Sequence, residues 1–331
     1  MARIALRSPY FFTRTAPTNT LSVKLLISID NVLKYTLIKS AVASQTSTFE
    51  VSELCRDYLT LVYDGSPAAG DTEIEIDLTM TFYDGINATG TGLQTISLTN
   101  NIGTDAYGYF SEGANWESPY PLSSAASWLI APKEDVNTEW EIFVPENKSG
   151  YLPYMLNGVI GYEFYSGSAQ SKTIGVAVTC TINRLPCSKY EPQRITFVNK
   201  YGQFQDLWFA LKKVLTTSTT KEEYQGINLT SGGSSTTYDT TKATKVVYNK
   251  EATERITLNS GYYPEAYNAV FEQLLESEQV WIQFLNSVGQ TQYLPVNVVT
   301  SSFVKKTKLN DKLIDYTIEF AEAYDKINNI R

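Results

Sequence analysis

The most constraining feature of the sequence is the segment at residues 73–82, EIEIDLTMTF, in which apolar and polar side chains alternate without a break. Successive side chains of a β-strand point to opposite faces, so all the apolar residues from Ile74 to Phe82 share one face. A strand with one buried and one solvated face is typical of antiparallel sheets. The segment therefore predicts an antiparallel β-sandwich with this acidic face in solvent.

A second stretch, residues 187–209, divides the chain. It contains two short apolar runs around the turn KYGQ at 200–203, where Gly202 can adopt a positive φ angle. This pattern predicts a β-hairpin. A long β-rich region precedes the hairpin and a shorter region with one helix follows it, so we interpret the hairpin as the seam between two domains.

Three shorter patterns add elements before the seam. Asp30 and Asn31 separate two apolar runs and predict a β-hairpin. Residues 49–59 have the apolar spacing of a short helix or turn, with Ser52 as a candidate cap. Residues 172–183 alternate again and predict a strand that closes the first domain.

The main helix is predicted at residues 264–278, where Tyr267, Val270, Phe271, Leu274 and Leu275 follow helical spacing after Pro264. We therefore expect a mainly β protein with an α+β C-terminal part. Residues 1–185 would form a β-sandwich-like domain with an aromatic-rich insertion at about 100–170. Residues 186–331 would form a smaller α+β assembly domain.

Residues 213–245 are rich in Thr, Ser and Gly, and the run SGGSSTTYDTT at 231–241 is the extreme of this composition. Such a composition favours a flexible loop or the tip of a long hairpin. Strands are expected at 245–249 and 254–258. We predict that residues 220–245 are mobile in the isolated protein and become ordered against a neighbouring molecule.

The composition excludes several classes of function. The sequence has no histidine, which removes Ser-His-Asp and Cys-His catalysis and the usual zinc sites. A net charge of -8 argues against nucleic-acid binding. No segment is apolar enough for a membrane span, and the N-terminus has no signal-peptide pattern. The three cysteines fit buried thiols better than a disulfide framework, although a Cys180–Cys187 bridge remains an alternative.

Two groups of residues are candidates for contact with a ligand or a partner. Aromatic residues gather in the insertion, and Trp116, Tyr120, Trp128 and Trp140 are the ones that we single out. They would stack on a host glycan, or else fill a core or an intersubunit contact.

The second group is a lysine cluster at a predicted hairpin tip, represented by Lys305 and Lys306. It is either a solvated turn or a contact with an acidic neighbouring subunit.

Carboxylate pairs that a glycosidase would need exist, such as Glu112 with Glu117 and Glu139 with Glu141. Nothing in their surroundings distinguishes them from other acidic residues. We therefore predict no catalytic, cofactor-binding or metal-binding residues, and a protein that is not an enzyme.

Several segments resemble a group of virion structural proteins of tailed bacteriophages, including phages of Bacteroidetes-type hosts. They are KYEPQRITFVNKYGQFQDLWF, ERITLNSGYYPEAYNAVFEQLLESEQVWI and KLNDKLIDYTIEFAEAYDKIN, with FEVSELCRDYL and the opening strands near the N-terminus. The similarity covers residues 1–83 and about 172–331. It implies a protein of the virion, assembled in the host cytoplasm, whose partners are copies of itself and other virion proteins.

The leading hypothesis is a tail or baseplate protein that oligomerises and connects tail parts or fibres. A neck, collar or head-decoration protein is the close alternative. A protein that binds a host surface glycan through residues 100–170 is the second class of function, and an enzyme is the third.

Overall fold

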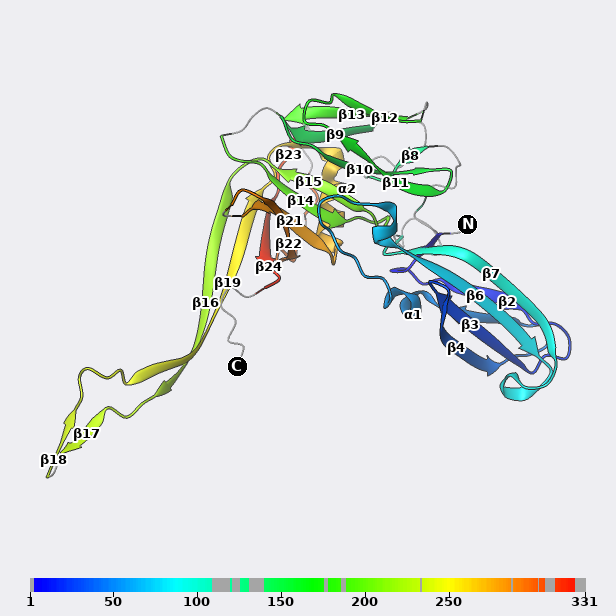
Figure 1. Cartoon of the computed structure of the whole chain (residues 1–331), viewed down its shortest axis with the longest axis horizontal. Coiled ribbons are helices and arrows are strands. Elements are labelled where there is room, and N and C mark those ends of the chain that lie inside the picture. The colour runs from blue at the N-terminus through cyan, green and yellow to red at the C-terminus, as the bar shows by residue number, and fades with distance from the viewer. Residues whose placement is uncertain are drawn as a thin grey trace.

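The computed structural model describes residues 3–108, 120, 126–130, 140–175, 178–185, 189–232, 234–286, 288–302, 304–306 and 313–324. The expectation of a mainly β protein is confirmed, since strands dominate and the described residues form only two short α-helices. Figure 1 shows the strands in three regions: a sheet near the N-terminus, a middle region of small sheets, and a large sheet from which a long hairpin projects.

The N-terminal region is a five-stranded sheet faced by a two-stranded sheet, and one hydrophobic core lies between them. The alternation predicted around residues 73–82 is confirmed, because every second residue of the central strand is buried from Ile74 to Phe82. From the facing sheet, Phe12 and Phe49 enter the same core. The larger sheet has the order β1 (Arg3–Ala5), β7 (Gly92–Thr104), β6 (Glu73–Tyr83), β3 (Ser22–Ile29), β4 (Val32–Ser40), and the smaller one pairs β2 (Phe11–Thr15) with β5 (Thr46–Glu50).

The hairpin predicted at Asp30 and Asn31 is confirmed. Both residues have positive φ angles, 49° and 63°, as a type I′ turn requires. The short helix or turn expected over residues 49–59 is present as α1 (Ser52–Arg56) followed by a turn, and β5 runs to Glu50 before it. Ser52 is not its cap. The Glu50 carboxylate accepts the Ser52 backbone N–H at 2.8 Å instead.

The middle region consists of two three-stranded sheets that share a core containing Trp128, Trp140 and Tyr165. The strand expected over 172–183 is instead a hairpin. Gly175 turns the chain with a φ angle of 55°, so Ile174 pairs with Val178. The sheets are β11 (Val159–Tyr165), β10 (Gly150–Leu156), β8 (Ser127–Trp128) and β12 (Ser171–Ile174), β13 (Val178–Leu185), β9 (Trp140–Pro145).

The C-terminal region is a seven-stranded sheet with a helix packed against one face. Helix α2 (Asn268–Glu276) buries Val270, Phe271 and Leu274 in a core with residues of six strands of this sheet. It is shorter than expected over 264–278, because Glu265–Tyr267 form a 3₁₀ turn and Ser277 is extended. The sheet order is β15 (Phe204–Phe209), β14 (Gln193–Val198), β21 (Val280–Leu285), β22 (Thr291–Val298), β24 (Thr317–Glu322), β19 (Lys245–Asn259), β16 (Lys213–Gln225). A small sheet, β20 (Tyr263–Pro264) with β23 (Leu313–Ile314), lies beside it.

The predicted hairpin around residues 200–203 is confirmed as β14 and β15, and its turn is buried rather than exposed. Thr72 donates a hydrogen bond to the Gln203 side chain at 2.9 Å, and Tyr162 donates to the same oxygen at 2.8 Å. On another side, Gln273 of α2 accepts the Lys200 backbone N–H at 3.1 Å. The turn therefore joins all three regions, and we call it the hub.

Candidate functional site

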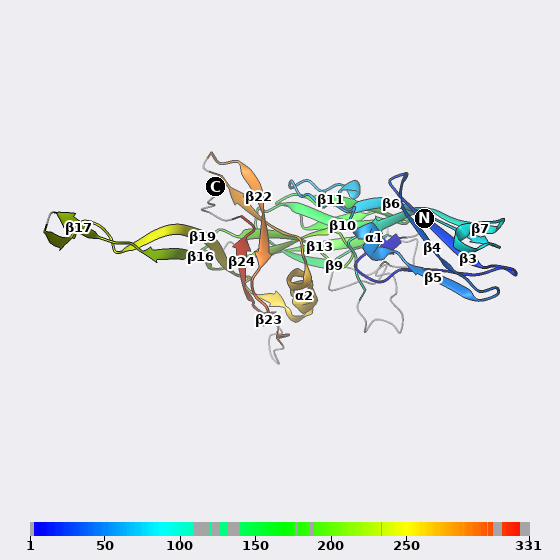
Figure 2. The same ribbon diagram turned by 90° about the horizontal axis from the view of Figure 1, so that it is seen from below.

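The most distinctive feature of the surface is a two-stranded β-hairpin that leaves the large sheet. Its strands β16 and β19 pair antiparallel from Lys213 to Gln225, and a smaller hairpin of β17 (Leu229–Gly232) and β18 (Ser235–Tyr238) forms its tip. At about 3.4 Å per residue, 13 paired residues span roughly 45 Å. Figures 1 and 2 show this hairpin extending away from the rest of the molecule. We call residues 213–259 the arm.

Local sequence explains why the arm is β-structure. Residues 214–220, VLTTSTT, are mostly β-branched, and β-branched side chains favour strands. Of the two alternatives predicted for residues 231–241, a flexible loop or the tip of a long hairpin, the hairpin tip is confirmed. The sequence predicted no strand over 213–225 and two separate strands at 245–249 and 254–258. Instead, β19 is continuous over 15 residues, with one irregularity in the pairing opposite Glu222 and Glu223. The threonines favour a strand here, but the Ser and Gly residues of the same segment favour a loop, so the strand was not predicted.

The arm is incomplete as an independent structure. Every residue of β16 is exposed. Among the described residues, β19 pairs only with β16 over Lys245–Glu254, because β24 pairs with it from Arg255 to Asn259. Two-stranded hairpins are marginally stable in water, and here Lys221 lies directly opposite Lys250, which is unfavourable. The arm is therefore suited to being completed by another surface.

Several apolar side chains towards the tip of the arm are exposed, whereas Ile256 and Leu258 at its base belong to the C-terminal core. Tyr224 and Tyr248 contact each other with ring centroids 6.1 Å apart, and both are exposed. Ile227, near the tip, is 87% exposed. Uncovered apolar residues of this kind mark protein contact surfaces when they gather in one place.

The N-terminal sheet provides a second free edge, β4. Within the described residues β4 pairs only with β3, so its other side is unpaired. Val32, Leu33 and Ile38 are exposed along it. Two lysines fold back from the strand: Lys34 lies 4.9 Å from the Tyr58 ring centroid and Lys39 lies 4.2 Å from that of Phe49. Lysines on an edge strand are a common protection against unwanted pairing.

Three of the predicted aromatic contact residues lie in the interior. Trp128 and Trp140 are 1% exposed and form part of the middle core. Tyr120 is buried between Thr104, whose hydroxyl lies 2.6 Å from its own, and the Tyr201 carbonyl, which accepts its hydrogen bond. Burial raises the pKa of Tyr120 to about 12. No sugar ring can stack on these residues without opening the core, so they pack the interior, and Trp116 lies outside the described residues.

The predicted lysines have partners within the chain. Lys305 forms an ion pair with Glu272 of α2 at 3.0 Å, and Lys306 forms one with Asp315 at 3.5 Å. Lys306 also lies over the Tyr316 ring. These contacts use intrachain acidic groups, which favours the solvated-turn interpretation over contact with an acidic subunit.

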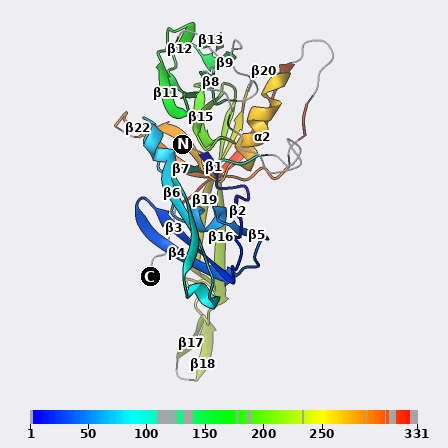
Figure 3. The same ribbon diagram turned by 90° about the vertical axis from the view of Figure 1, so that its right-hand side faces the viewer.

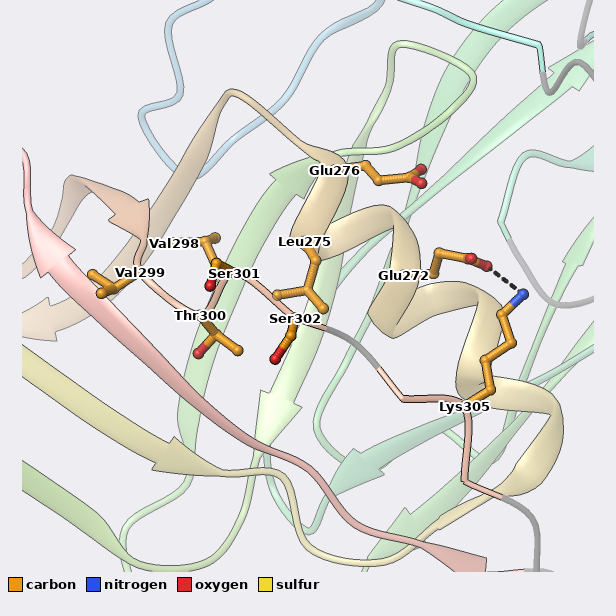
Figure 4. A pocket seen from close by; sticks show the side chains of 9 residues that line it. All are labelled: Glu272, Leu275, Glu276, Val298, Val299, Thr300, Ser301, Ser302 and Lys305. Carbon is orange, nitrogen blue, oxygen red and sulfur yellow. Dashed lines mark ion pairs between the residues drawn. The ribbon is translucent and has the colours of Figure 1, made fainter.

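The Lys305–Glu272 pair stands at the rim of a groove of about 670 Å³ beside α2, shown in Figure 4. Its lining combines carboxylates, hydroxyls and one lysine with two valines and one leucine. The lining residues are Glu272, Leu275, Glu276, Val298, Val299, Thr300, Ser301, Ser302 and Lys305.

Of the carboxylates considered for catalysis, Glu141 alone lies among the described residues. Glu141 accepts a hydrogen bond from Asn183 at 2.9 Å on the exposed side of β9. Its predicted companion Glu139, like Glu112 and Glu117, lies outside the described residues. Among the residues that the structure describes, no cluster of three metal-ligating side chains occurs.

A buried ion pair that the sequence did not predict lies between the two strands that the hub connects. Arg194 of β14 and Asp206 of β15 are 2.6 Å apart, and both side chains are 6% exposed. Tyr63 accepts a hydrogen bond from Arg194 at 2.7 Å, and Thr196 donates one to Asp206 at 2.7 Å. The neighbouring carboxylate outweighs burial and raises the pKa of Arg194. The segment containing Tyr63 is thereby fixed to the large sheet.

The described cysteines are buried thiols. Cys55 and Cys180 are both free, so the alternative Cys180–Cys187 bridge is absent; Cys187 itself lies outside the described residues. Burial raises the pKa of each of these two thiols to about 12. They remain protonated near neutral pH and are unsuited to nucleophilic chemistry.

Comparison with protein-family models and with curated proteins found no match for this chain. No helix in the described part of the chain has the length and apolar character needed to cross a bilayer.

Proposed function

We propose that this chain is a structural component of a tailed-phage virion, a tail or baseplate protein that oligomerises and connects tail parts or fibres. The resemblance of its hub, α2 and C-terminal segments to virion proteins gives the context. The observation that carries the proposal is the arm: an exposed two-stranded hairpin of 13 paired residues, with uncovered apolar side chains. Such an element gains stability when another molecule covers it.

The rest of the molecule fits a scaffold for that arm. The buried hub joins the three regions, and Arg194 fixes the segment containing Tyr63 to the large sheet, so the arm projects from a well-connected molecule. The binding of host glycan through the aromatic insertion is less well supported, because Tyr120, Trp128 and Trp140 are buried. The proposal assigns no catalytic activity to the chain.

The experiment that tests this function is labelling of intact particles with an antibody against the chain, viewed by negative-stain electron microscopy. We expect label at the distal end of the tail. Label at the neck or capsid would replace the tail assignment with the neck, collar or decoration alternative. Absence of the chain from both intact and disrupted particles would overturn the proposal.

A further inference from the structure

We propose that a small cavity between the middle region and the large sheet is the binding site of one structural water molecule, which Trp208, Tyr165 and Asp206 hold. The inference goes beyond the proposed function and does not depend on it. It concerns how two regions of the chain are joined in the interior.

The cavity has the size that one water molecule requires. It lies between β15 of the large sheet and β9, β10 and β11 of the middle region, and Figures 1 and 3 show β15 next to these strands. The volume that water can occupy is about 20 Å³. A single buried water needs about 10–15 Å³. Most of the lining residues, such as Leu152 and Leu207, are buried, so the cavity is largely closed to bulk solvent.

The indole N–H of Trp208 is the first polar group of this site. Trp208 is 4% exposed, and its Nε1 atom has no hydrogen-bond partner among the described residues. Burial raises the pKa of Tyr165 and Asp206 raises it further, whereas the nearby Trp208 N–H acts in the opposite direction. The N–H therefore lies close to the Tyr165 hydroxyl, although the two do not form a hydrogen bond. A buried donor without a partner is costly, and ordered water is a common partner for such groups.

The Tyr165 hydroxyl and the Asp206 carboxylate are the other two polar groups. A Cβ atom on Gly150 would lie 2.5 Å from Tyr165 Oη and 2.7 Å from Asp206 Oδ2, so both oxygens adjoin one place beside this glycine. Asp206 and Trp208 are two residues apart in β15, so their side chains share a face of the sheet. Together the three groups offer a donor, a carboxylate acceptor and a hydroxyl that can do either. A buried water makes about two to four hydrogen bonds, which this set can supply.

An unpartnered indole N–H does not by itself make a water site. The Nε1 atoms of Trp128 and Trp140 are also buried without a hydrogen-bond partner among the described residues, but neither tryptophan lines this cavity. Trp208 differs because a cavity of sufficient volume and two further polar groups adjoin it. The water would connect Tyr165 of β11 to β15, across the boundary between the middle region and the large sheet.

The direct test is a crystal structure of the full chain at a resolution that shows ordered waters. We expect one peak within about 3.2 Å of Trp208 Nε1 and within the same distance of Tyr165 Oη or Asp206 Oδ2. A cavity without such a peak, or a direct hydrogen bond from Trp208 to Tyr165 that closes it, would overturn the inference.

A second test measures the water in solution by magnetic relaxation dispersion of the water signal, which detects slowly exchanging internal waters. Tyr165→Phe removes one partner while it keeps the ring, so the contribution of slowly exchanging water should fall. The matched control is Tyr154→Phe, because Tyr154 packs against the same core but does not line the cavity. The control should leave the contribution unchanged.

Circular dichroism and the Tm of both variants check that the fold is kept. An unchanged contribution in Tyr165→Phe, or an equal loss in Tyr154→Phe, would contradict the assignment of the water to this cavity.

Discussion

At the scale of single residues, the Arg194–Asp206 ion pair is the buried interaction whose disruption should cost the most stability. Both groups are almost fully removed from solvent, and each has further hydrogen-bond partners. Taking away one member of a buried pair leaves the other charge without compensation, and this costs far more than loss of an exposed pair.

We predict that Asp206→Ala lowers the free energy of unfolding by about 3–5 kcal/mol, because the Arg194 guanidinium is left buried and unpaired. Urea denaturation measures this. The control is Glu319→Ala, which removes the more exposed pair with Arg255 and should cost no more than about 1 kcal/mol. Equal losses for the two variants would show that the buried pair has no special weight.

Asp105 predicts a dependence of stability on pH. Burial raises its pKa although Arg56 lies 3.0 Å away and acts in the opposite direction. A carboxyl with a raised pKa binds its proton more tightly in the folded chain, so its contribution to stability is greatest below the unfolded pKa and is lost as pH rises through the folded pKa. The natural chain should therefore gain stability relative to Asp105→Asn as pH falls from 7 to 4. A difference between the two proteins that is constant across this range contradicts the prediction.

At the scale of elements, the hub turn depends on one glycine. Gly202 has a φ angle of 70°, and a Cβ atom there would lie 2.9 Å from the backbone nitrogens of Asp105 and Ala106. Side chains disfavour both the angle and the close approach.

We predict that Gly202→Ala destabilises the protein by more than about 1 kcal/mol beyond the cost of its φ angle. The matched control is Gly158→Ala, whose φ angle is 77° and whose Cβ would meet nothing within 4 Å. Thermal denaturation of both variants separates the two contributions. If they lose the same stability, the contact with Asp105 and Ala106 is not tight.

Local patterns in the sequence were enough to predict elements that have one wet face or a tight turn. The alternation in β6 and the Asp30-Asn31 turn are of this kind. What the sequence could not provide was the surroundings of each residue. Trp128 and Trp140 have no local mark of burial, because their cover comes from strands distant in sequence, such as β13 and β15. The hub likewise has the composition of an exposed turn, and only tertiary contacts bury it.

The tip of a long hairpin was among the alternatives predicted for residues 231–241, but the strand β16 that leads to it was missed, for the opposite reason. Sequence patterns identify strands chiefly through burial, and β16 buries nothing within its own chain. Its residues carry only the intrinsic preference of Thr and Val for extended structure, which is a weak signal beside Ser and Gly.

At the scale of the whole molecule, amide hydrogens of the arm and of the remaining described residues should differ in their protection from exchange with solvent. We predict that amide hydrogens at residues 220–245 exchange rapidly in the monomer and slowly in the assembly, whereas those of β14 and β21 are slow in both. Hydrogen exchange followed by mass spectrometry measures this. Slow exchange throughout the arm in a monomer would show that it needs no neighbour.

The buried hub also bears on how the chain unfolds. Its hydrogen bonds join residues 131 positions apart, from Thr72 to Gln203, and 73 apart, from Lys200 to Gln273. Contacts of such high sequence separation form late and are lost together, which slows folding and couples distant segments. A cut anywhere between residues 72 and 273 would leave fragments that each lack part of the same junction. The described residues outside the arm should therefore unfold in one cooperative transition, in which the contacts of the turn at 200–203 are lost.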